Sequence, residues 1–276
     1  MNPPSITTPA LPTVTVSSLP LDIPPGAEVF KCRNLKNPFG KDVAIVQSES
    51  TMTEGSHHMF VFHDPAYVSD SPTLEDCSGV ELHDFVHLAQ SPHVTWTYPD
   101  GVARLLRGTD GLRFAVHYVN TTTDTLTAQV SVTFSYTDPS SSKFLAAPIF
   151  LNQTLLVVPE GTSTASRQFA VPYDIELMRA VGHMHSRGID FTATASTGEM
   201  LYEGTDWNEP QERVFDPPLE LVAGTTITWS CKYQNDTGLV LTFGESATQN
   251  EMCILYGLFY PTDPSANQGV TIGGLI

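Results

Sequence analysis

The sequence predicts an all-β protein made of two tandem antiparallel β-sandwich domains. Short segments of alternating apolar and polar residues recur along the chain, and turns rich in Gly and Pro separate them. No long segment carries a helical period. With 276 residues, of which 41% are hydrophobic, the chain is long enough to bury a core in each domain.

In the first half, the clearest alternation covers residues 112–119. Leu112, Phe114, Val116 and Tyr118 share the apolar face, and His117 lies on the more polar face. Residues 126–136 alternate without a break, and further strands are expected at 28–32, 42–47 and 56–63. Residues 64–100 are turn-rich. We expect residues 1–27, rich in Pro, Ser and Thr, to form a flexible or extended lead-in, followed by a first domain over 28–150.

A polar segment near residues 138–143 marks the approach to the domain boundary, and the second domain is predicted over 151–276. Its strands are expected at 153–158, 166–170, 177–185, 190–195, 225–233 and 251–260. The last of these is an almost continuous apolar run, which is typical of a central strand.

The net charge of −17 argues against nucleic acid and anionic membrane surfaces as partners. No apolar run reaches the length of about 18 residues that a membrane span needs, so no membrane span is expected. The chain as given shows no signal-peptide pattern. Three Asn-x-Ser/Thr triplets, at Asn120, Asn152 and Asn235, matter only where exported proteins are glycosylated.

The candidate site is centred on His183 and His185. Two histidines two apart lie on the same side of a strand, so both rings can converge on one ion. Met184 then points to the other face. Two polar residues on a solvated face are the alternative. Met252 is a candidate third ligand, and a thioether favours Cu(I) over zinc, magnesium or calcium; simple core packing is its alternative role.

The first half offers a second set, His57, His58 and His117. Because His57 and His58 are adjacent, a regular strand would point them to opposite faces, and both can bind one ion only at a bulge or a strand start. One buried and one exposed histidine is the alternative. An all-imidazole set suits copper or zinc, so zinc hydrolysis and copper redox chemistry both stay open here. His83 and His87 have the spacing of a helical zinc pair, but a solvated or capping role is favoured for them.

Four motifs occur in the order found in one enzyme family: GSHHMFVF at 55–62, FAVHY at 114–118, HMH at 183–185, and GES at 244–246 leading to EMC at 251–253. Over residues 28–261 the chain resembles the type II copper, ascorbate-dependent monooxygenases, such as peptidylglycine α-hydroxylating monooxygenase and dopamine β-hydroxylase. The resemblance implies two jelly-roll-like sandwiches with one copper each, facing each other across an open cleft.

The resemblance also implies the ligand sets and their roles. His57, His58 and His117 would hold the copper that supplies an electron, and His183, His185 and Met252 the copper where O2 reacts with a small-molecule substrate. Ascorbate or a similar donor would reduce both. Disulfides Cys32–Cys77 and Cys231–Cys253 are implied as well, and with them an oxidising location, secreted or periplasmic.

Departures from the family bear on the substrate. Where the peptide-hydroxylating members have an arginine that clamps the peptide carboxylate, this chain has Val181, and their asparagine is replaced by Ile254. Their tyrosine is kept as Tyr256, a candidate catalytic residue. Arg179 and Arg187 are possible substitutes for the missing guanidinium. We therefore expect a less polar substrate than a glycine-extended peptide.

Three classes of function remain open. A copper monooxygenase hydroxylating a C–H bond is favoured. A catalytically inactive copper-binding or storage protein of the same fold is the alternative, and a β-sandwich interaction module with incidental histidines is the third. The loop with Asp206, Trp207 and Glu209 is a candidate binding rim, although a solvated loop is the simpler interpretation. The oligomeric state is left open.

Overall fold

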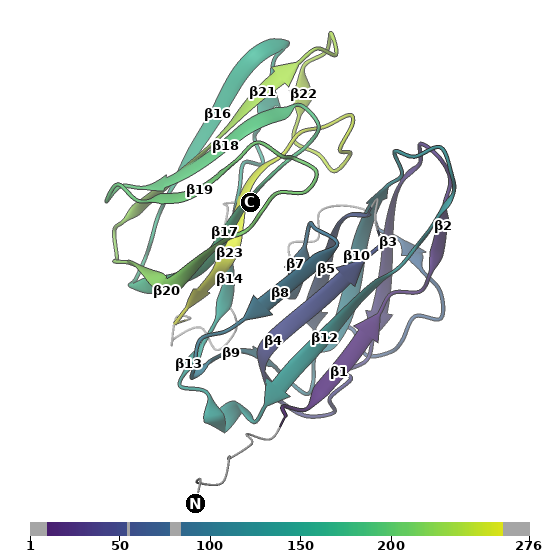
Figure 1. The fold of residues 1–276 in the computed structure, drawn as a ribbon, viewed down its shortest axis with the longest axis vertical. Helices are drawn as coiled ribbons and strands as arrows, with labels where there is room; N and C mark the ends of the chain where they lie inside the picture. The colour runs from purple at the N-terminus through teal and green to yellow at the C-terminus, as the bar shows by residue number, and fades with distance from the viewer. Residues whose placement is uncertain (1–9, 54–55, 78–83, 262–276) are drawn as a thin grey trace, which may run out of the picture.

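The computed structural model describes residues 10–53, 56–77 and 84–261. Over this part of the chain it is all-β, as predicted, with two sandwiches in tandem and a single short 3-10 turn at Pro139–Ser141. Figure 1 shows the first sandwich in purple to teal and the second in teal to yellow, packed against each other. No helix among the described residues is long and apolar enough to span a membrane.

The first sandwich consists of two main sheets. One has the order β1-β12-β4-β9-β13, with β8 also paired to β4, and the other has the order β6-β3-β10-β5-β7. The strands are β1 Thr13–Ser17, β3 Glu28–Leu35, β4 Val43–Met52, β5 Ser56–Asp64, β6 Glu75–Asp76, β7 Phe85–Ala89, β8 His93–Thr97, β9 Val102–Leu106, β10 Gly111–Val119, β12 Val130–Thr137 and β13 Phe144–Leu145. A small pair, β2 Leu21–Ile23 with β11 Leu126–Ala128, completes it.

The second sandwich also has two sheets, with orders β14-β23-β17-β20 and β16-β21-β18-β19. Its strands are β14 Ala147–Asn152, β16 Gly161–Ala170, β17 Ile175–Met184, β18 Gly188–Ala195, β19 Met200–Gly204, β20 Arg213–Leu221, β21 Thr226–Asn235 and β23 Cys253–Tyr260, with β15 Val157–Val158 paired to β22 Leu241–Thr242. All of these pairs are antiparallel.

Four details of the sequence prediction are corrected. Within the expected lead-in, β1 pairs with β12 and β2 pairs with β11, so residues from Thr13 onward belong to the sandwich. The turn-rich segment contains β7 and β8. The strand expected at 126–136 is divided at Gln129, and that expected at 153–158 is replaced by β14, a turn and β15. Sheet partners change at Ala146, close to the expected boundary.

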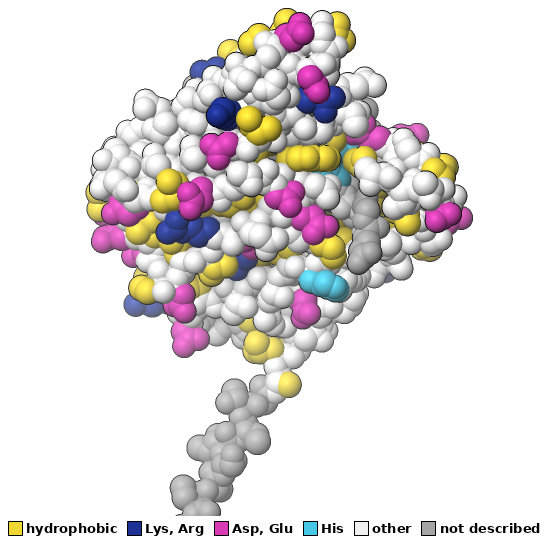
Figure 2. All heavy atoms as spheres, turned by 45° about the horizontal axis from the view of Figure 1, so that its top comes forward, with side chains coloured by type: hydrophobic (Ala, Val, Ile, Leu, Met, Phe, Trp, Pro, Cys, Tyr) yellow, Lys and Arg dark blue, Asp and Glu magenta, His cyan; other side chains and the backbone are white. Residues whose placement is uncertain are grey.

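Each sandwich has an interior of large apolar side chains. Trp96, Phe114 and Phe134 are fully buried in the first sandwich, and Phe191 and Phe259 in the second. Burying a side chain of this size contributes roughly 1.5–3 kcal/mol, so the alternation seen in the sequence is the main source of the fold. Figure 2 shows acidic side chains spread over one face of the molecule rather than gathered in one patch.

Both predicted disulfides are present. Cys32–Cys77 ties β3 to the segment after β6, and Cys231–Cys253 ties β21 to β23 across the second sandwich. In the second case the bond joins the two sheets at the point where β23 begins, directly after Met252.

Two of the three Asn-x-Thr triplets, those at Asn120 and Asn235, form the same turn, one in each sandwich. The Asn120 amide donates to the carbonyls of Ile23 and Asp124, each at 2.8 Å. The Asn235 amide donates to those of Val158 and Leu239, at 3.1 and 2.7 Å. Both side chains are 1% exposed, so their amide nitrogens are closed to glycosylation in the folded chain.

The sandwiches meet through β5 and β8 on one side and β14 and β17 on the other. The Phe150 ring lies 6.4 Å from Phe60 and 6.3 Å from Phe85, measured between centroids. Arg179 lies over Trp96 at 5.5 Å and donates to the Thr95 carbonyl at 3.3 Å. This apolar and cationic contact fixes which faces of the two sandwiches oppose each other.

Candidate metal centre

The first histidine set depends on a bulge at His57. His58 pairs with His117 across β5 and β10, but Tyr118 pairs with Ser56, so His57 is the extra residue. The bulge is one of the two conditions that the sequence required for His57 and His58 to face the same way. The three rings form a nearly equilateral group, with centroids 5.0 Å (His57–His58), 5.0 Å (His57–His117) and 4.9 Å (His58–His117) apart.

The second set lies at the end of β17. The rings of His183 and His185 are 5.1 Å apart, as their alternation on one face requires. Met184 points the other way, where a Cβ added to Gly188 would lie 2.6 Å from its side chain. The β17–β23 register ends with Met184 opposite Cys253, so the next residues, His185 and Met252, are neighbours across the pair.

The two sets come together in one cluster, which the resemblance did not lead us to expect. The His57 ring lies 5.6 Å from His183 and 6.0 Å from His185, and His58 lies 5.5 Å from His183. One ligand nitrogen from each of His57, His58 and His183 lies within 4.8 Å of the others. In place of two groups across an open cleft, the described residues form a single five-histidine cluster between the sandwiches.

The cluster is sheltered, and its ring nitrogens are poorly satisfied. His57, His117, His183 and His185 are at most 5% exposed, and His58 is partly buried. No hydrogen-bond partner among the described residues reaches either nitrogen of His57, or one nitrogen each of His58, His117 and His185. Buried polar groups are normally paired, so these orphaned nitrogens fit a bound metal ion.

Burial also keeps these imidazoles neutral. It holds the pKa of His57, His58 and His183 well below the usual 6.5 and lowers that of His185 to about 4. The pKa of His117 is lowered too, because burial outweighs the opposing effect of Glu28. A neutral imidazole is the form that binds metal.

Glu28 links the first set to the second sandwich. Its carboxylate accepts hydrogen bonds from Nε2 of His117 at 2.9 Å, from the Ala247 N–H at 2.8 Å and from the Ser246 hydroxyl at 2.8 Å. A carboxylate behind a histidine fixes which ring nitrogen is free to bind metal, leaving Nδ1 of His117. Sequence reasoning missed Glu28, because only the β3–β10 pairing and the docking of the second sandwich bring it there.

Gln90 links His183 to Tyr256. The Gln90 side chain contacts Nδ1 of His183 through its amide nitrogen and accepts the Tyr256 hydroxyl proton at 3.0 Å. Tyr256 is buried, and burial raises its pKa well above 10. The candidate catalytic Tyr256 therefore contacts His183 through Gln90, a residue that no sequence signal indicated.

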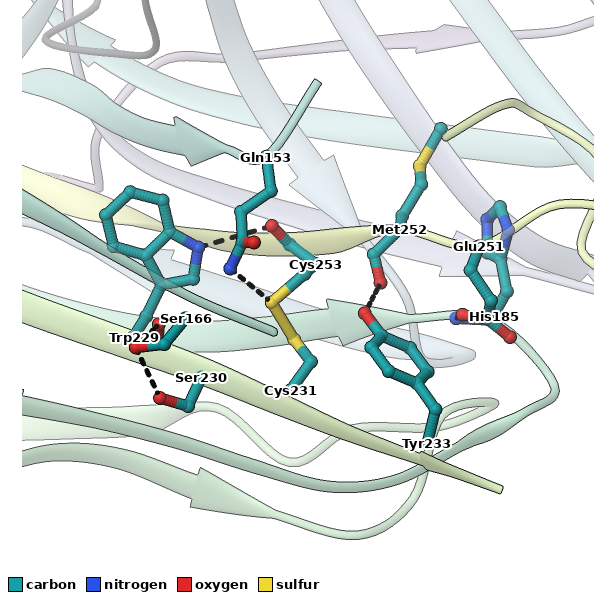
Figure 3. The surroundings of a disulfide bond; sticks show 10 residues. All are labelled: Gln153, Ser166, His185, Trp229, Ser230, Cys231, Tyr233, Glu251, Met252 and Cys253. Carbon is teal, nitrogen blue, oxygen red and sulfur yellow. Dashed lines mark hydrogen bonds between the residues drawn. A yellow bond between two sulfur atoms is a disulfide. The ribbon is translucent and has the colours of Figure 1, made fainter. Parts of the chain in front are cut away.

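Several contacts hold Met252 and the adjoining turn (Figure 3). The Tyr233 hydroxyl donates to the Met252 carbonyl at 2.8 Å. The buried carboxylate of Glu251 accepts the N–H groups of His185 at 3.0 Å and Arg187 at 2.7 Å, and burial raises its pKa to about 7. Together with the Cys231–Cys253 bond, these contacts fix the chain on both sides of the methionine.

The positions tied to substrate are apolar or already engaged. Val181 and Ile254 are buried. Arg179 forms an ion pair with Glu212 at 2.6 Å, and Arg187 one with Asp236 at 3.3 Å. Arg179 is therefore engaged in a largely buried ion pair, whereas the Arg187 pair is solvent-exposed and weak.

Two further residues differ from the simpler expectations. Trp207 is half-buried against His57, with ring centroids 5.6 Å apart, so its loop reaches over the cluster instead of standing free in solvent. His87 lies on strand β7, fully buried, with Nδ1 2.8 Å from the Ser48 hydroxyl, so a helical, solvated or capping role is wrong for it. His83 lies outside the described residues.

No model of a known protein family matches the chain, and no curated protein matches it in sequence. Among solved structures, it is similar to the major capsid protein P2 of bacteriophage PM2, with a TM-score of 0.36, 6% identity, and coverage of 90% of this chain and 97% of that one. It is also similar to the VP2 subviral particle of infectious bursal disease virus, with a TM-score of 0.20, 10% identity, and coverage of 94% and 73%. These scores are too low to bear on function.

Proposed function

We propose that this protein is a copper-dependent monooxygenase that hydroxylates a substrate C–H bond with O2 and an external one-electron donor such as ascorbate. The observation that carries the proposal is the sheltered cluster of five imidazoles, most with an unpaired ring nitrogen. Bound copper would supply one-electron redox chemistry and the reaction with O2. The neighbouring thioether of Met252 favours copper over zinc.

The chain's own residues would position and insulate the ions. Glu28 orients His117, and Gln90 orients His183. Burial around the cluster excludes water, which strengthens every electrostatic interaction inside it. We expect two coppers per chain, with ligands drawn from His57, His58, His117, His183, His185 and Met252.

The substrate is expected to lack a carboxylate that needs clamping. Val181 and Ile254 offer only apolar contacts, and Arg179 is neutralised by Glu212. A glycine-extended peptide is therefore disfavoured. The two disulfides support an oxidising, extracytoplasmic location, secreted or periplasmic.

A copper-binding or storage protein without catalysis is the second candidate. The observation in its favour is the closure of the cluster: His57 and His185 are 0% exposed, and the side chains that would bind a substrate are replaced or engaged. Such a protein needs the ligands but no route for a substrate.

Copper stoichiometry and ascorbate-dependent oxygen uptake test the proposal. The variant is Met252→Leu, which removes the thioether at nearly constant volume. Its matched control is Met184→Leu, since Met184 is also buried but faces Gly188 in the sandwich interior. Two coppers per chain, with uptake lost only in Met252→Leu, would support the oxygenase.

Copper binding without uptake on any substrate would support the storage protein instead. Zinc, or no metal at all, in protein supplied with copper would contradict both candidates.

A further inference from the structure

The tightest group of ligand atoms in the cluster does not follow the division into two sets. It combines His57 and His58 from the first sandwich with His183 from the second, one nitrogen from each lying within 4.8 Å of the others. We propose that one metal ion binds between the sandwiches, held by His57, His58 and His183. This inference rests on the proposed metal centre but not on its oxygenase activity.

The free nitrogens agree with this assignment. Both ring nitrogens of His57 and Nδ1 of His58 lack partners among the described residues. One ring nitrogen of His183 completes the group of three. Nε2 is the nitrogen that binds an ion when the Gln90 amide is turned so that its oxygen accepts the Nδ1 proton. Imidazole nitrogens bound at about 2.0–2.1 Å in a tetrahedral site lie roughly 3.4 Å apart. Rotations moving each ring by about 1 Å would close the present separations to that value.

The remaining two histidines are held differently. His117 lies close to His57 and His58 by ring centroid, but its Nε2 is bound to Glu28. Nδ1 of His185 lies 3.2 Å from the Asn250 carbonyl oxygen, beside Met252. Each keeps one nitrogen free, so these two are placed to complete the coordination or to bind a second ion.

A shared ion has a mechanical consequence that separate ions lack. Because its ligands come from both sandwiches, it binds tightly only while the sandwiches are in contact, and it stabilises that contact by linkage. The ion therefore works as a clasp between β5 and the end of β17.

A double-mutant cycle on Cu(I) affinity tests the clasp. The full-length chain and the variants His58→Ala, His183→Ala and the double variant are titrated with Cu(I) against a chromogenic chelator, with circular dichroism as the check on folding. The control is His93→Ala, because His93 is exposed on β8. Each single change is expected to weaken the tightest site by at least about 100-fold, since outer partners alone are worth roughly 10–100-fold.

The double variant is expected to bind the first ion about as weakly as either single variant, because both changes remove a ligand from the same ion. Normal affinity of either single variant for the first ion would place the ions in separate sets and overturn the inference. Failure of the wild type to bind Cu(I) would overturn it together with the proposed function. Cu(I) binding without oxygen uptake would remove only the oxygenase.

Hydrogen exchange on the wild-type chain gives a test that needs no variant. Binding of one equivalent of Cu(I) is expected to raise amide protection in β5 and β10 together with that in β17 and β23. A rise confined to one sandwich would contradict a shared ion.

Discussion

The metal-free protein should lose stability steeply between pH 7.5 and 5.5. Burial lowers the pKa of His185 to about 4 and that of His87 to about 3. It also holds the pKa of His57, His58 and His183 well below 6.5. All five side chains are neutral in the folded state over this pH range, whereas in the unfolded chain they titrate near about pH 6.5.

The sign and size of the effect follow from proton uptake. Below pH 6.5 the unfolded chain binds protons that the folded chain does not, so the free energy of unfolding falls as the pH falls. The contribution that these neutral histidines make to stability is fully present above pH 6.5. It is lost as the pH falls towards their folded-state pKa values. At pH 5.5 each histidine lowers the free energy of unfolding by about 1.4 kcal/mol, and the five together lower it by about 7 kcal/mol. This loss is comparable to the roughly 5–15 kcal/mol that stabilises a typical protein.

One histidine opposes the trend. Burial alone would lower the pKa of His63, but hydrogen bonds to Asp110 and Asp84 raise it above 6.5. The folded state therefore gains stability from protonated His63 at low pH. Its contribution is opposite in sign to the five losses.

Urea unfolding of the metal-free chain at pH 7.5, 6.5 and 5.5 measures this slope. His87→Gln should flatten this slope by about one proton. A total fall of less than about 2 kcal/mol between pH 7.5 and 5.5 would show that the histidines are protonated in the folded state, and the closed cluster would then be wrong.

Two further changes probe the contacts around the cluster. Glu28→Gln should cost about 1–2 kcal/mol at pH 7, allowing for partial exposure of the carboxylate. Partial burial alone would raise the pKa of Glu28, but hydrogen bonds, chiefly from His117, lower it to about 2. The difference in free energy of unfolding between wild type and Glu28→Gln, measured with urea, should therefore shrink as the pH falls from 4.5 towards 2. A difference that stays constant would contradict the carboxylate's role. Gly182→Ala should destabilise by about 1–3 kcal/mol through overpacking, because the new Cβ would lie 2.5 Å from the Phe191 ring. In thermal unfolding, the additional change Phe191→Leu should recover part of the stability lost in Gly182→Ala. If Gly182→Ala costs the same stability in the wild type and in the Phe191→Leu background, the clash with the ring is not the cause.

Local patterns predicted most of the central strands. Strands β10, β17 and β23 each carry a face of apolar residues, and burial of that face decides their conformation wherever the chain runs. Strands β1, β7 and β20 were missed. Each depends on pairing with a partner far along the chain, and such pairing overrides a weak or Pro-rich local sequence.

The site divides in the same way. The spacing of His183 and His185 was enough to place both on one face, and the adjacency of His57 and His58 was enough to require a bulge or a strand start. The merging of the two sets was not predictable from spacing. It depends on how two sandwiches pack, through contacts such as Phe60 with Phe150 that no local period encodes.

In the closed cluster, tight metal binding and access of a substrate to the ligands exclude each other. A substrate cannot reach rings that are 0% exposed unless the sandwiches move apart, and an ion shared by His58 and His183 resists that movement. Several of the contacts that hold the faces together are polar, among them Glu28 with Ser246 and Arg179 with the Thr95 carbonyl. If these release, the two ligand sets separate, and each keeps its own complement of three: His57, His58 and His117 on one side, and His183, His185 and Met252 on the other. The same six side chains would then serve a clasped state that stores the metal and an opened state that exposes it, with the balance set by the affinity of the shared ion.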